Sequence, residues 1–328
     1  MSTNEDEFTL PLHGGFAGSF LQFPHVKPSA EAIRKAGAKA AIYGMPWDAT
    51  SISRTGASYG PRAVRNESAQ FLTYNATLDF DVAEALHPVD CGDVRVVPAN
   101  AEKTFANAQR DVGEILDGGA LPIVLGGDHS VTIPGVRAVA ERHERPGLIL
   151  IDTHLDTNPE TEGETLNHTC DIARALDAGF PGEKIALVGI SGWMNPSGEL
   201  AAARDAGISI FWIEDIWANG VQKVAERALQ VATNGTDGFY LSLDLDGLDA
   251  AFFPGTCCPT PGGLTAREYI ELTRAFAGSG KVLSADITEI APTLDPTPGG
   301  VQTALMAGRV ALEVMAFHAG ASYEPKSL

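Results

Sequence analysis

Short apolar runs alternate with longer amphipathic segments along nearly the whole chain. The apolar runs have the length of strands and lie at residues 40–45, 121–125, 147–152, 184–190, 209–213, 238–244 and 282–287. Segments with a helical period lie between them, including residues 61–71, 102–117, 216–233, 265–276 and 301–317. Runs that are apolar throughout are typical of strands buried on both faces of a sheet. The pattern therefore predicts an α/β fold of three layers, α/β/α, with a mainly parallel central sheet.

A single domain is the expected organisation. The chain of 328 residues has no internal repeat and no low-complexity linker, and α/β folds of this size commonly form one core. We expect residues 1–328 to form one domain, with an N-terminal arm at residues 1–28 and a tail at residues 320–328. Right-handed crossovers would then place the loops after the strands at one edge of the sheet, where ligands bind in such folds.

The net charge restricts the classes of partner. The chain has 23 basic and 42 acidic residues, which gives a formal net charge of −19. Nucleic acids and anionic membranes require basic surface, so neither is an expected partner. A cationic substrate is compatible with this charge, although most of the carboxylates are expected to be solvated surface groups.

The cysteines and the N-terminus predict a cytoplasmic protein. Cys91, Cys170, Cys257 and Cys258 fit neither a CxxC metal knuckle nor a disulfide framework. The first ten residues, MSTNEDEFTL, are acidic and lack the basic and apolar regions of a signal peptide. No apolar run approaches the roughly 18 residues that a membrane-spanning helix needs.

Acidic and histidine residues follow three of the predicted strands. These motifs are GGDHS at residues 126–130, DTHLD at residues 152–156 and DLD at residues 244–246. In an extended segment alternate side chains share a face, so Asp152, His154 and Asp156 can converge, as can Asp244 and Asp246. A lone Asp or His in such a place is more often a turn former or a core residue, but three such motifs together indicate a site.

The combination predicts a metal centre. Four carboxylates in one cleft are strongly unfavourable unless cations compensate their charge. Oxygen-rich ligation with two imidazoles is typical of a site for Mn²⁺ or a related divalent ion and not of a thiolate-rich zinc site. Two ions about 3.5–4 Å apart can hold a hydroxide and deliver it to an electrophilic carbon. The candidate ligands are His129, Asp152, His154, Asp156, Asp244 and Asp246.

These motifs and several others, in the same order, resemble the arginase/agmatinase, or ureohydrolase, superfamily. The further motifs are GMPWD at 44–48, GASYGPRAVR at 56–65, DCGD at 90–93, PGT at 254–256, PGGL at 261–264 and DITEIAP at 286–292. The resemblance covers nearly the whole chain. It implies an arginase-like fold and a binuclear-metal hydrolase, in which a metal-bridging hydroxide attacks a guanidinium-type carbon and breaks a C–N bond.

The resemblance also implies individual roles. One ion would be held by His129, Asp152, Asp156 and Asp244, and the other by Asp152, His154, Asp244 and Asp246, so that Asp152 and Asp244 bridge. Glu289 would lie beside the guanidinium, and His168 would be the proton-transfer histidine; with Asp156 they form the predicted catalytic set. A carboxylate can hold a planar cation through paired hydrogen bonds, and a histidine can move a proton near neutral pH.

Departures from the family pattern bear on the substrate. Residues 157–164 do not match the polar loop with which arginases bind the amino-acid end of arginine, so arginine is a poor candidate. Thr153, His168 with Thr169, residues 191–196 and residues 249–255 look more like agmatinase-like relatives that hydrolyse guanidine or metformin, a branch associated with nickel. The expected cofactors are therefore two divalent ions per chain, Ni²⁺ or Mn²⁺. Guanidine or a metformin-like biguanide is the first candidate substrate, with agmatine and guanidinobutyrate as alternatives.

Three further residues are candidates for contact with this small cation. Trp193 could present its aromatic face to an alkylated cation, or it could pack in the core as most tryptophans do. Cys257 and Cys258 follow the Pro-Gly-Thr turn, where they are expected to shape the pocket. A role for them as metal ligands is less favoured, because the carboxylate–imidazole set is already complete.

Two other functions stay open at this point. The chain could be a non-catalytic companion subunit of a hetero-oligomeric ureohydrolase, although its intact ligand set argues against this. It could also be a mononuclear zinc deacetylase of the same fold, which His154 and Asp246 disfavour because they complete a second ion site. The resemblance further implies a homo-oligomer, a trimer or hexamer, or a hetero-oligomer with a related chain.

Overall fold

The computed structural model describes residues 18–323, so part of the predicted arm (residues 1–17) and of the tail (residues 324–328) lies outside the described residues. In the described range the main sheet has eight parallel strands in the order β4-β1-β5-β10-β9-β6-β7-β8. The strands are β1 (Ala40–Gly44), β4 (Val89–Asp93), β5 (Leu121–Leu125), β6 (Pro146–Ile151), β7 (Ile185–Ile190), β8 (Ser209–Trp212), β9 (Gly238–Asp244) and β10 (Val282–Thr288). A short antiparallel pair, β2 (Tyr74–Asn75) and β3 (Phe80–Asp81), lies apart from it.

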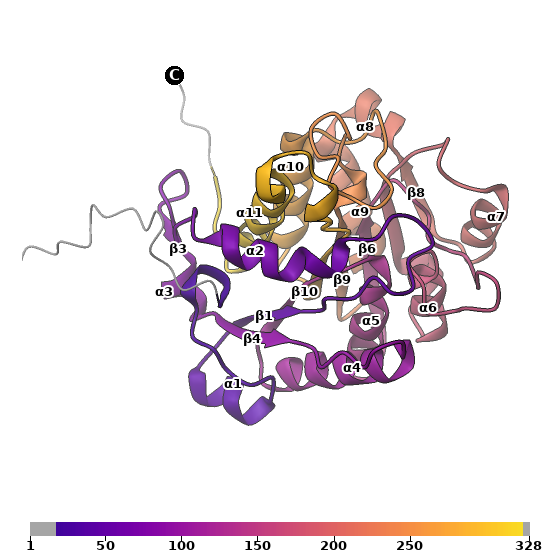
Figure 1. The fold of residues 1–328 in the computed structure, drawn as a ribbon. Helices are drawn as coiled ribbons and strands as arrows, with labels where there is room; N and C mark the ends of the chain where they lie inside the picture. The colour runs from indigo at the N-terminus through magenta and orange to yellow at the C-terminus, as the bar shows by residue number, and fades with distance from the viewer. Residues whose placement is uncertain (1–17, 324–328) are drawn as a thin grey trace, which may run out of the picture.

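Helices cover both faces of the sheet, which confirms the predicted three layers (Figure 1). One layer contains α2 (Gly60–Ser68), α3 (Val82–Leu86), α8 (Ile213–Asn219), α9 (Val221–Thr233), α10 (Ala266–Ala277) and α11 (Val301–His318). The other contains α1 (Ala30–Ala36), α4 (Ala101–Asp117), α5 (Thr132–Ala140), α6 (Asp171–Asp177) and α7 (Ser197–Asp205). Among the described residues no helix is both long enough and apolar enough to cross a membrane.

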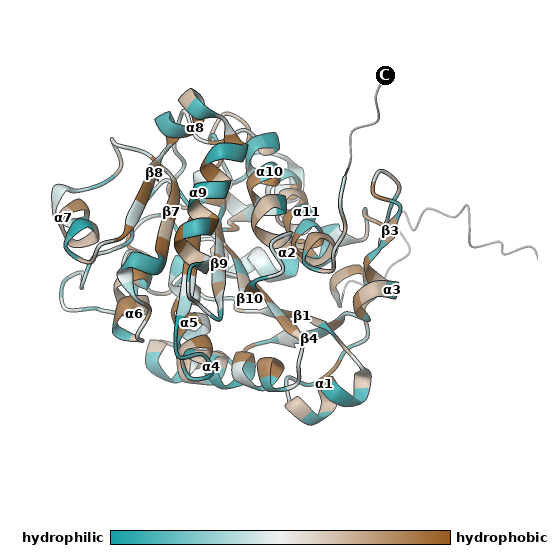
Figure 2. Ribbon diagram, turned by 180° about the vertical axis from the view of Figure 1, so that it is seen from behind, coloured by the Kyte–Doolittle hydropathy of each residue, from teal (hydrophilic) through white to brown (hydrophobic). Residues whose placement is uncertain are grey.

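The strands are apolar throughout because each contributes to two cores. In β6, Ile149 and Ile151 pack with residues of α9, α10 and α11, whereas Leu148 and Leu150 pack with residues of α5 and α6. Successive side chains of a strand point to opposite faces, so in a strand between two helical layers every side chain faces a buried core. Figure 2 shows the result, with brown strands between helices that carry both brown and teal segments.

Strand β4 was missing from the expected set of strands. Its sequence, VDCGD, contains two aspartates and a glycine and therefore does not read as a buried strand. The structure buries Asp90 by pairing it with Arg65, whose Nε and Nη2 lie 2.8 and 2.9 Å from its carboxylate oxygens. A tertiary ion pair thus allows a polar sequence to form the edge of the sheet.

The helix expected at residues 216–233 is two helices. Gly220 separates α8 from α9, with φ of 80° and ψ of 158°, a conformation outside the helical region that a glycine adopts without steric cost. The amphipathic pattern continues across the break because both helices pack on the same face of the sheet, so periodicity alone does not show the change of direction.

Candidate metal centre

Four neighbouring strands at the centre of the sheet end at the same place. β5, β10, β9 and β6 lie side by side, and all are parallel. His129 follows β5, Asp152 follows β6, Asp244 ends β9 and Glu289 follows β10. Since parallel strands have their carboxyl ends at one edge of a sheet, the fold brings these side chains together. The backbone N–H of His129 donates to Glu289 Oε1 at 2.9 Å, although 160 positions separate the two residues.

The first group of side chains surrounds His129. Its Nδ1 lies 3.1 Å from Asp152 Oδ2, 2.8 Å from Asp156 Oδ2 and 2.9 Å from Asp244 Oδ2. A ring nitrogen can donate one proton to one acceptor, and among residues 18–323 neither Nδ1 nor Asp152 Oδ2 has a partner in hydrogen-bond geometry. Three carboxylates that converge on an imidazole nitrogen without bonding to it fit the ligand set of a cation.

The second group surrounds His154. Its Nδ1 lies 3.3 Å from Asp152 Oδ1 and 3.8 Å from Asp246 Oδ2. Potential ligand atoms of Asp244, Asp246 and Glu289 also lie within 4.8 Å of one another. Asp152 therefore belongs to both groups, and Asp244 lies beside His129 in the first and beside Asp246 of the second, as expected of bridging carboxylates. The structure brings all six predicted ligands together, and their role as ligands remains a prediction.

The electrostatics of the site also favour bound cations. Its buried carboxylates belong to Asp128, Asp152, Asp156, Asp171, Asp244, Asp246 and Glu289. Burial and neighbouring carboxylates raise the pKa of Asp128 and the pKa of Asp244 to about 7. Such shifts mean that the protein interior disfavours this much negative charge. Two divalent ions would supply four positive charges, and the donor set of carboxylates and imidazoles fits them.

Two of the predicted catalytic residues have an unusual backbone. Asp156 has φ of 48° and Glu289 has φ of 56°, in the left-handed region that non-glycine residues rarely adopt. Such conformations cost on the order of 1–3 kcal/mol each and occur preferentially at functional sites. The fold holds Glu289 there through the hydrogen bond from its N–H to Gly127 O, at 2.8 Å.

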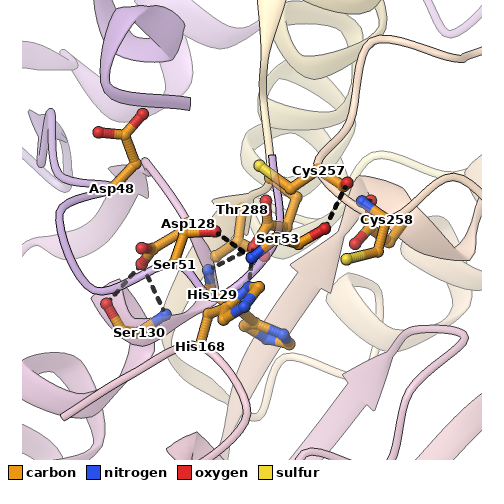
Figure 3. A network of polar contacts seen from close by, with 12 residues as sticks. Asp48, Ser51, Ser53, Asp128, His129, Ser130, His168, Cys257, Cys258 and Thr288 are labelled. Atoms are coloured by element: carbon orange, nitrogen blue, oxygen red, sulfur yellow. Dashed lines mark hydrogen bonds and ion pairs between the residues drawn. The ribbon is translucent and has the colours of Figure 1, made fainter. Parts of the chain in front are cut away.

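Glu289 and His168 are in contact. His168 Nδ1 lies 3.2 Å from Glu289 Oε1, and the backbone N–H of Ile52 faces His168 Nε2 at 3.1 Å. Burial by itself lowers the pKa of His168, but the hydrogen bond to Glu289 and its charge raise this pKa to about 9. The Ile52 contact acts in the opposite direction, since Nε2 can accept only when it carries no proton. Figure 3 shows His168 next to His129, on the side of the cluster away from Asp48.

A cleft of about 290 Å³ opens onto these groups. Its lining includes His129, His154, Asp156, His168, Asp246 and Glu289. Cys258 also lines it, whereas Cys257 does not: its side chain is 1% exposed and packs against Ala57 and Ala291. The structure thus gives the two adjacent cysteines different surroundings.

Trp193 does not reach the cleft, contrary to either role considered for it. Its side chain is 99% exposed, so it neither lines the cleft nor packs in the core. The reason lies in Asn195, whose side chain accepts from Leu155 N–H at 2.7 Å and donates to Thr153 O at 3.0 Å. These bonds hold the loop after β7 so that Met194 and Pro196 line the cleft and Trp193 points outward.

Sequence reasoning missed residues that support the ligands from behind. Ser242 Oγ lies 3.1 Å from His129 Nε2, and Asp171 Oδ2 lies 3.7 Å from the same nitrogen. Ser242 shares a strand face with Asp244, so the two-residue alternation could have identified it. Asp171 stands in the first turn of α6, where an acidic residue ordinarily stabilises the helix end and signals nothing more.

Asp171 is expected to strengthen metal binding through His129. It is fully buried, and neither of its carboxylate oxygens has a hydrogen-bond partner among residues 18–323. Ser242 is the residue at hydrogen-bond distance from His129 Nε2, and the charge of Asp171 raises the basicity of the ring from 3.7 Å. Loss of such an outer partner typically costs about 10–100-fold in metal affinity. We expect Asp171→Asn to lower the affinity for one ion by that factor, measured by calorimetric titration of metal-free protein.

The free energy of unfolding provides the check on this prediction. Asp171 has no hydrogen-bond partner and lies near Asp152 and Asp156 as well as His129, so metal-free Asp171→Asn should be about as stable as metal-free wild type. Asp177→Asn is the matched control, because Asp177 lies on the same helix but is exposed and pairs with Arg174. Unchanged metal affinity together with a loss of stability would mean that Asp171 serves only the fold.

The comparisons with known proteins agree with this geometry. Residues 38–317 match the family model of the arginase family. The chain is 30% identical to a guanidinobutyrase of Pseudomonas aeruginosa over 88% of each chain. It is 32% identical to the mitochondrial agmatinase of Gallus gallus, over 90% of this chain and 84% of the relative.

Solved structures support the same relationship. The proclavaminate amidino hydrolase of Streptomyces clavuligerus superimposes with a TM-score of 0.85 at 28% sequence identity, over 94% of this chain and 99% of that chain. The arginase of Bacillus caldovelox superimposes with a TM-score of 0.72 at 28% identity, over 87% of this chain and 99% of that one.

Proposed function

This chain belongs to the arginase family, whose members hydrolyse C–N bonds of guanidino compounds, and we propose that its own substrate is a small guanidino cation without a carboxylate. Guanidine or a metformin-like biguanide is the first candidate. Water would add to the guanidino carbon that carries the leaving amine, and the C–N bond to that amine would break. Guanidine would then yield urea and ammonia, and metformin would yield guanylurea and dimethylamine.

The charge of the cleft carries this proposal. Its lining includes the carboxylates of Asp156, Glu199, Asp244, Asp246 and Glu289, and no lysine or arginine of residues 18–323 lines it. A substrate carboxylate placed there would lack a basic partner and would face Glu199 and Glu289, the two lining carboxylates that are not among the proposed metal ligands. This argues against arginine, and it also ranks guanidinobutyrate below cations that carry no acid group.

Arg54 lies near the cleft and could in principle bind a substrate carboxylate, but its guanidinium already donates hydrogen bonds to the backbone. Its Nε donates to Cys257 O at 3.0 Å, and its Nη2 donates to Thr256 O. A guanidinium that holds two backbone carbonyls has lost part of its capacity to bind a carboxylate. Arg54 therefore supports the wall of the cleft.

The residues of the site have distinct tasks in such a reaction. His129, Asp152, His154, Asp156, Asp244 and Asp246 would hold two divalent ions, which when bound supply an activated water and offset the buried charge. Glu289 Oε1 is occupied by the His129 N–H and by His168, whereas Oε2 has no partner among the described residues and can accept from the guanidinium. His168 lines the cleft, where it can deliver a proton to the departing amine.

The rim of the cleft supports an alkylated cation. Ile52, Met194 and Pro196 line the cleft and give part of its surface an apolar character that N-methyl groups of a biguanide can contact. Agmatine is the second candidate, because Glu199 lines the same cleft and could hold a terminal amine. Burial raises the pKa of Glu199 to about 7, and a bound ammonium would favour its charged form.

The test is a substrate panel. Urea or guanylurea release is measured for guanidine, metformin, agmatine, 4-guanidinobutyrate and arginine, with full-length protein reconstituted separately with Ni²⁺ and with Mn²⁺. We expect guanidine or metformin to have the highest kcat/KM, because these substrates place no carboxylate in an acidic cleft. Preferential turnover of guanidinobutyrate or arginine would contradict the proposal.

Two outcomes would point to the alternative functions. Two bound ions per chain without turnover of any substrate would favour a companion subunit, and the search would move to a related partner chain. One bound zinc ion per chain would favour a mononuclear deacetylase. Light scattering of the metal-loaded protein would test the trimer or hexamer that we propose for the assembled enzyme.

A further inference from the structure

A thiol lies beside the second group of candidate ligands. Potential ligand atoms of Cys258, His154 and Asp246, the first being the Sγ, all lie within 4.8 Å of one another. Cys258 is half-buried, lines the cleft and donates its backbone N–H to Asp246 Oδ1 at 3.2 Å. The group is therefore an Asp–His–Cys triangle at one of the two positions where the fold gathers metal-binding side chains.

The loop that follows β9 places this thiol, because it folds back toward the end of the strand. After β9 the loop runs outward and comes back, with bridges that pair Leu248 with Leu264 and Asp249 with Thr260. Ser53 Oγ and Arg54 Nε donate to Cys257 O at 3.2 and 3.0 Å. A segment held by hydrogen bonds from two directions positions its side chains well enough to serve as ligands.

The adjacent cysteine provides an internal contrast. Cys257 belongs to a small apolar cluster with Ala57 and Ala291 and does not line the cleft. It is absent from the groups of metal-ligating atoms found among residues 18–323, whereas Cys258 belongs to one. Figure 3 shows the two thiols pointing in different directions.

We propose that Cys258 Sγ binds, as a thiolate, the same ion that His154 and Asp246 hold. This proposal rests on the two-ion centre described above and adds a sulfur ligand to its carboxylate–imidazole set. Thiolates are soft ligands, and Mn²⁺ prefers oxygen, whereas Ni²⁺, Co²⁺ and Zn²⁺ bind sulfur well. The cysteine would therefore shift the selectivity of this position away from Mn²⁺.

Optical spectroscopy of the metal-loaded protein tests the ligand directly. Full-length protein is depleted of metal and titrated with Co²⁺ or Ni²⁺, and we expect a sulfur-to-metal charge-transfer band in the near ultraviolet. Cys258→Ser should lose the band, whereas Cys257→Ser and Cys91→Ser should keep it. A wild-type protein that binds two ions without this band, or a band that persists in Cys258→Ser, would overturn the proposal.

Competitive binding gives a second readout that does not depend on activity. We expect Cys258→Ser to reduce the ratio of Ni²⁺ to Mn²⁺ affinity by about 10–100-fold, the size of effect typical of changes around a metal site. Cys257→Ser should leave the ratio unchanged. If Cys258→Ser does not fold, as circular dichroism would show, Cys258→Thr replaces it with a branched hydroxyl side chain. An unchanged ratio in the folded variant would count against the thiolate.

Failure of this proposal can be distinguished from failure of the proposed function. Two ions, turnover of a guanidino cation and no charge-transfer band would remove the thiolate ligand but leave the hydrolase in place. A protein that binds neither ion would remove the basis of both.

Discussion

Asp244→Asn should abolish metal loading and lower the release of urea or guanylurea by at least about 100-fold, more than the loss of an outer-shell partner of a metal usually costs. Asp244 Oδ2 lies 2.9 Å from His129 Nδ1, and its carboxylate also lies among the ligand atoms of Asp246 and Glu289. A bridging carboxylate contributes charge to both ion positions, and a neutral amide of the same shape cannot replace that charge. Metal content by mass spectrometry and product release measure the two effects.

The fold should survive this substitution. The backbone N–H of Asp246 donates to Asp244 Oδ1 at 2.5 Å, a bond that the Asn carbonyl oxygen can keep. Thr288 Oγ1 donates to Asp244 Oδ2 at 3.1 Å, and this hydroxyl can instead accept from the Asn amide. Tyr269 OH donates to the backbone carbonyl of Asp244 at 2.9 Å. Because burial raises the pKa of Asp244 to about 7, its charge is a cost to the metal-free protein. We therefore expect metal-free Asp244→Asn to melt no lower than metal-free wild type.

Asp286→Asn is the matched control for Asp244→Asn. Asp286 is also a buried carboxylate near a strand end, but Thr132, Tyr240 and Ser242 donate hydrogen bonds to it and it belongs to no metal-ligating group among the described residues. The Asp286→Asn variant should have a lower free energy of unfolding and should still bind both ions. Turnover by Asp244→Asn in the absence of metal would refute the binuclear centre.

Glu289→Gln should lower kcat/KM by roughly 100–4000-fold while both ions stay bound. The substitution removes the charge that faces the guanidinium, and loss of one partner of a buried ion pair costs about 3–5 kcal/mol, where each 1.4 kcal/mol is tenfold in rate. The Gln carbonyl can still accept the His129 N–H in place of Glu289 Oε1, so the site should keep its shape. Steady-state kinetics and metal content are measured on the same preparation.

Two comparisons sharpen the Glu289 experiment. If Glu289 holds substrate and transition state equally, KM rises and kcat stays constant; if it acts mainly in the transition state, kcat falls. Glu199→Gln is the control, because Glu199 lines the same cleft and should matter for agmatine but not for guanidine. Loss of both ions in Glu289→Gln would instead make Glu289 part of the metal site.

The fold was largely predictable because its strands are buried on both faces. Seven of the strands of the main sheet coincide with apolar runs, and the helical periods located α2, α4, α10 and α11. β4 could not be found in this way, because its Asp90 is stabilised by Arg65, a partner from another element. The break at Gly220 was invisible for a related reason: the apolar face continues through it.

The gathering of the candidate ligands at one edge was predictable, but the expected extended geometry was wrong in detail. Asp246 lies in a 3₁₀ turn, Leu245–Gly247, and Asp156 has a left-handed backbone with φ of 48°. Parallel strands bring their carboxyl ends to one edge whatever the details of the loops. The sequence alone therefore determined the three-layer fold and the cluster of carboxylates and imidazoles at the centre of the sheet.

Tertiary structure alone decided the lining of the cleft. Trp193 points to solvent because Asn195 forms hydrogen bonds with the loop after β6. Cys258 lies beside Asp246 because the chain turns back after β9, where Arg54 donates a hydrogen bond to the carbonyl of Cys257. Asp171 lies behind His129 because α6 packs beside α5. The face to which a strand side chain points follows from a repeat of two residues, and this repeat is visible in a sequence. Loop conformation depends on hydrogen bonds between residues far apart in the chain, and a single sequence does not show these.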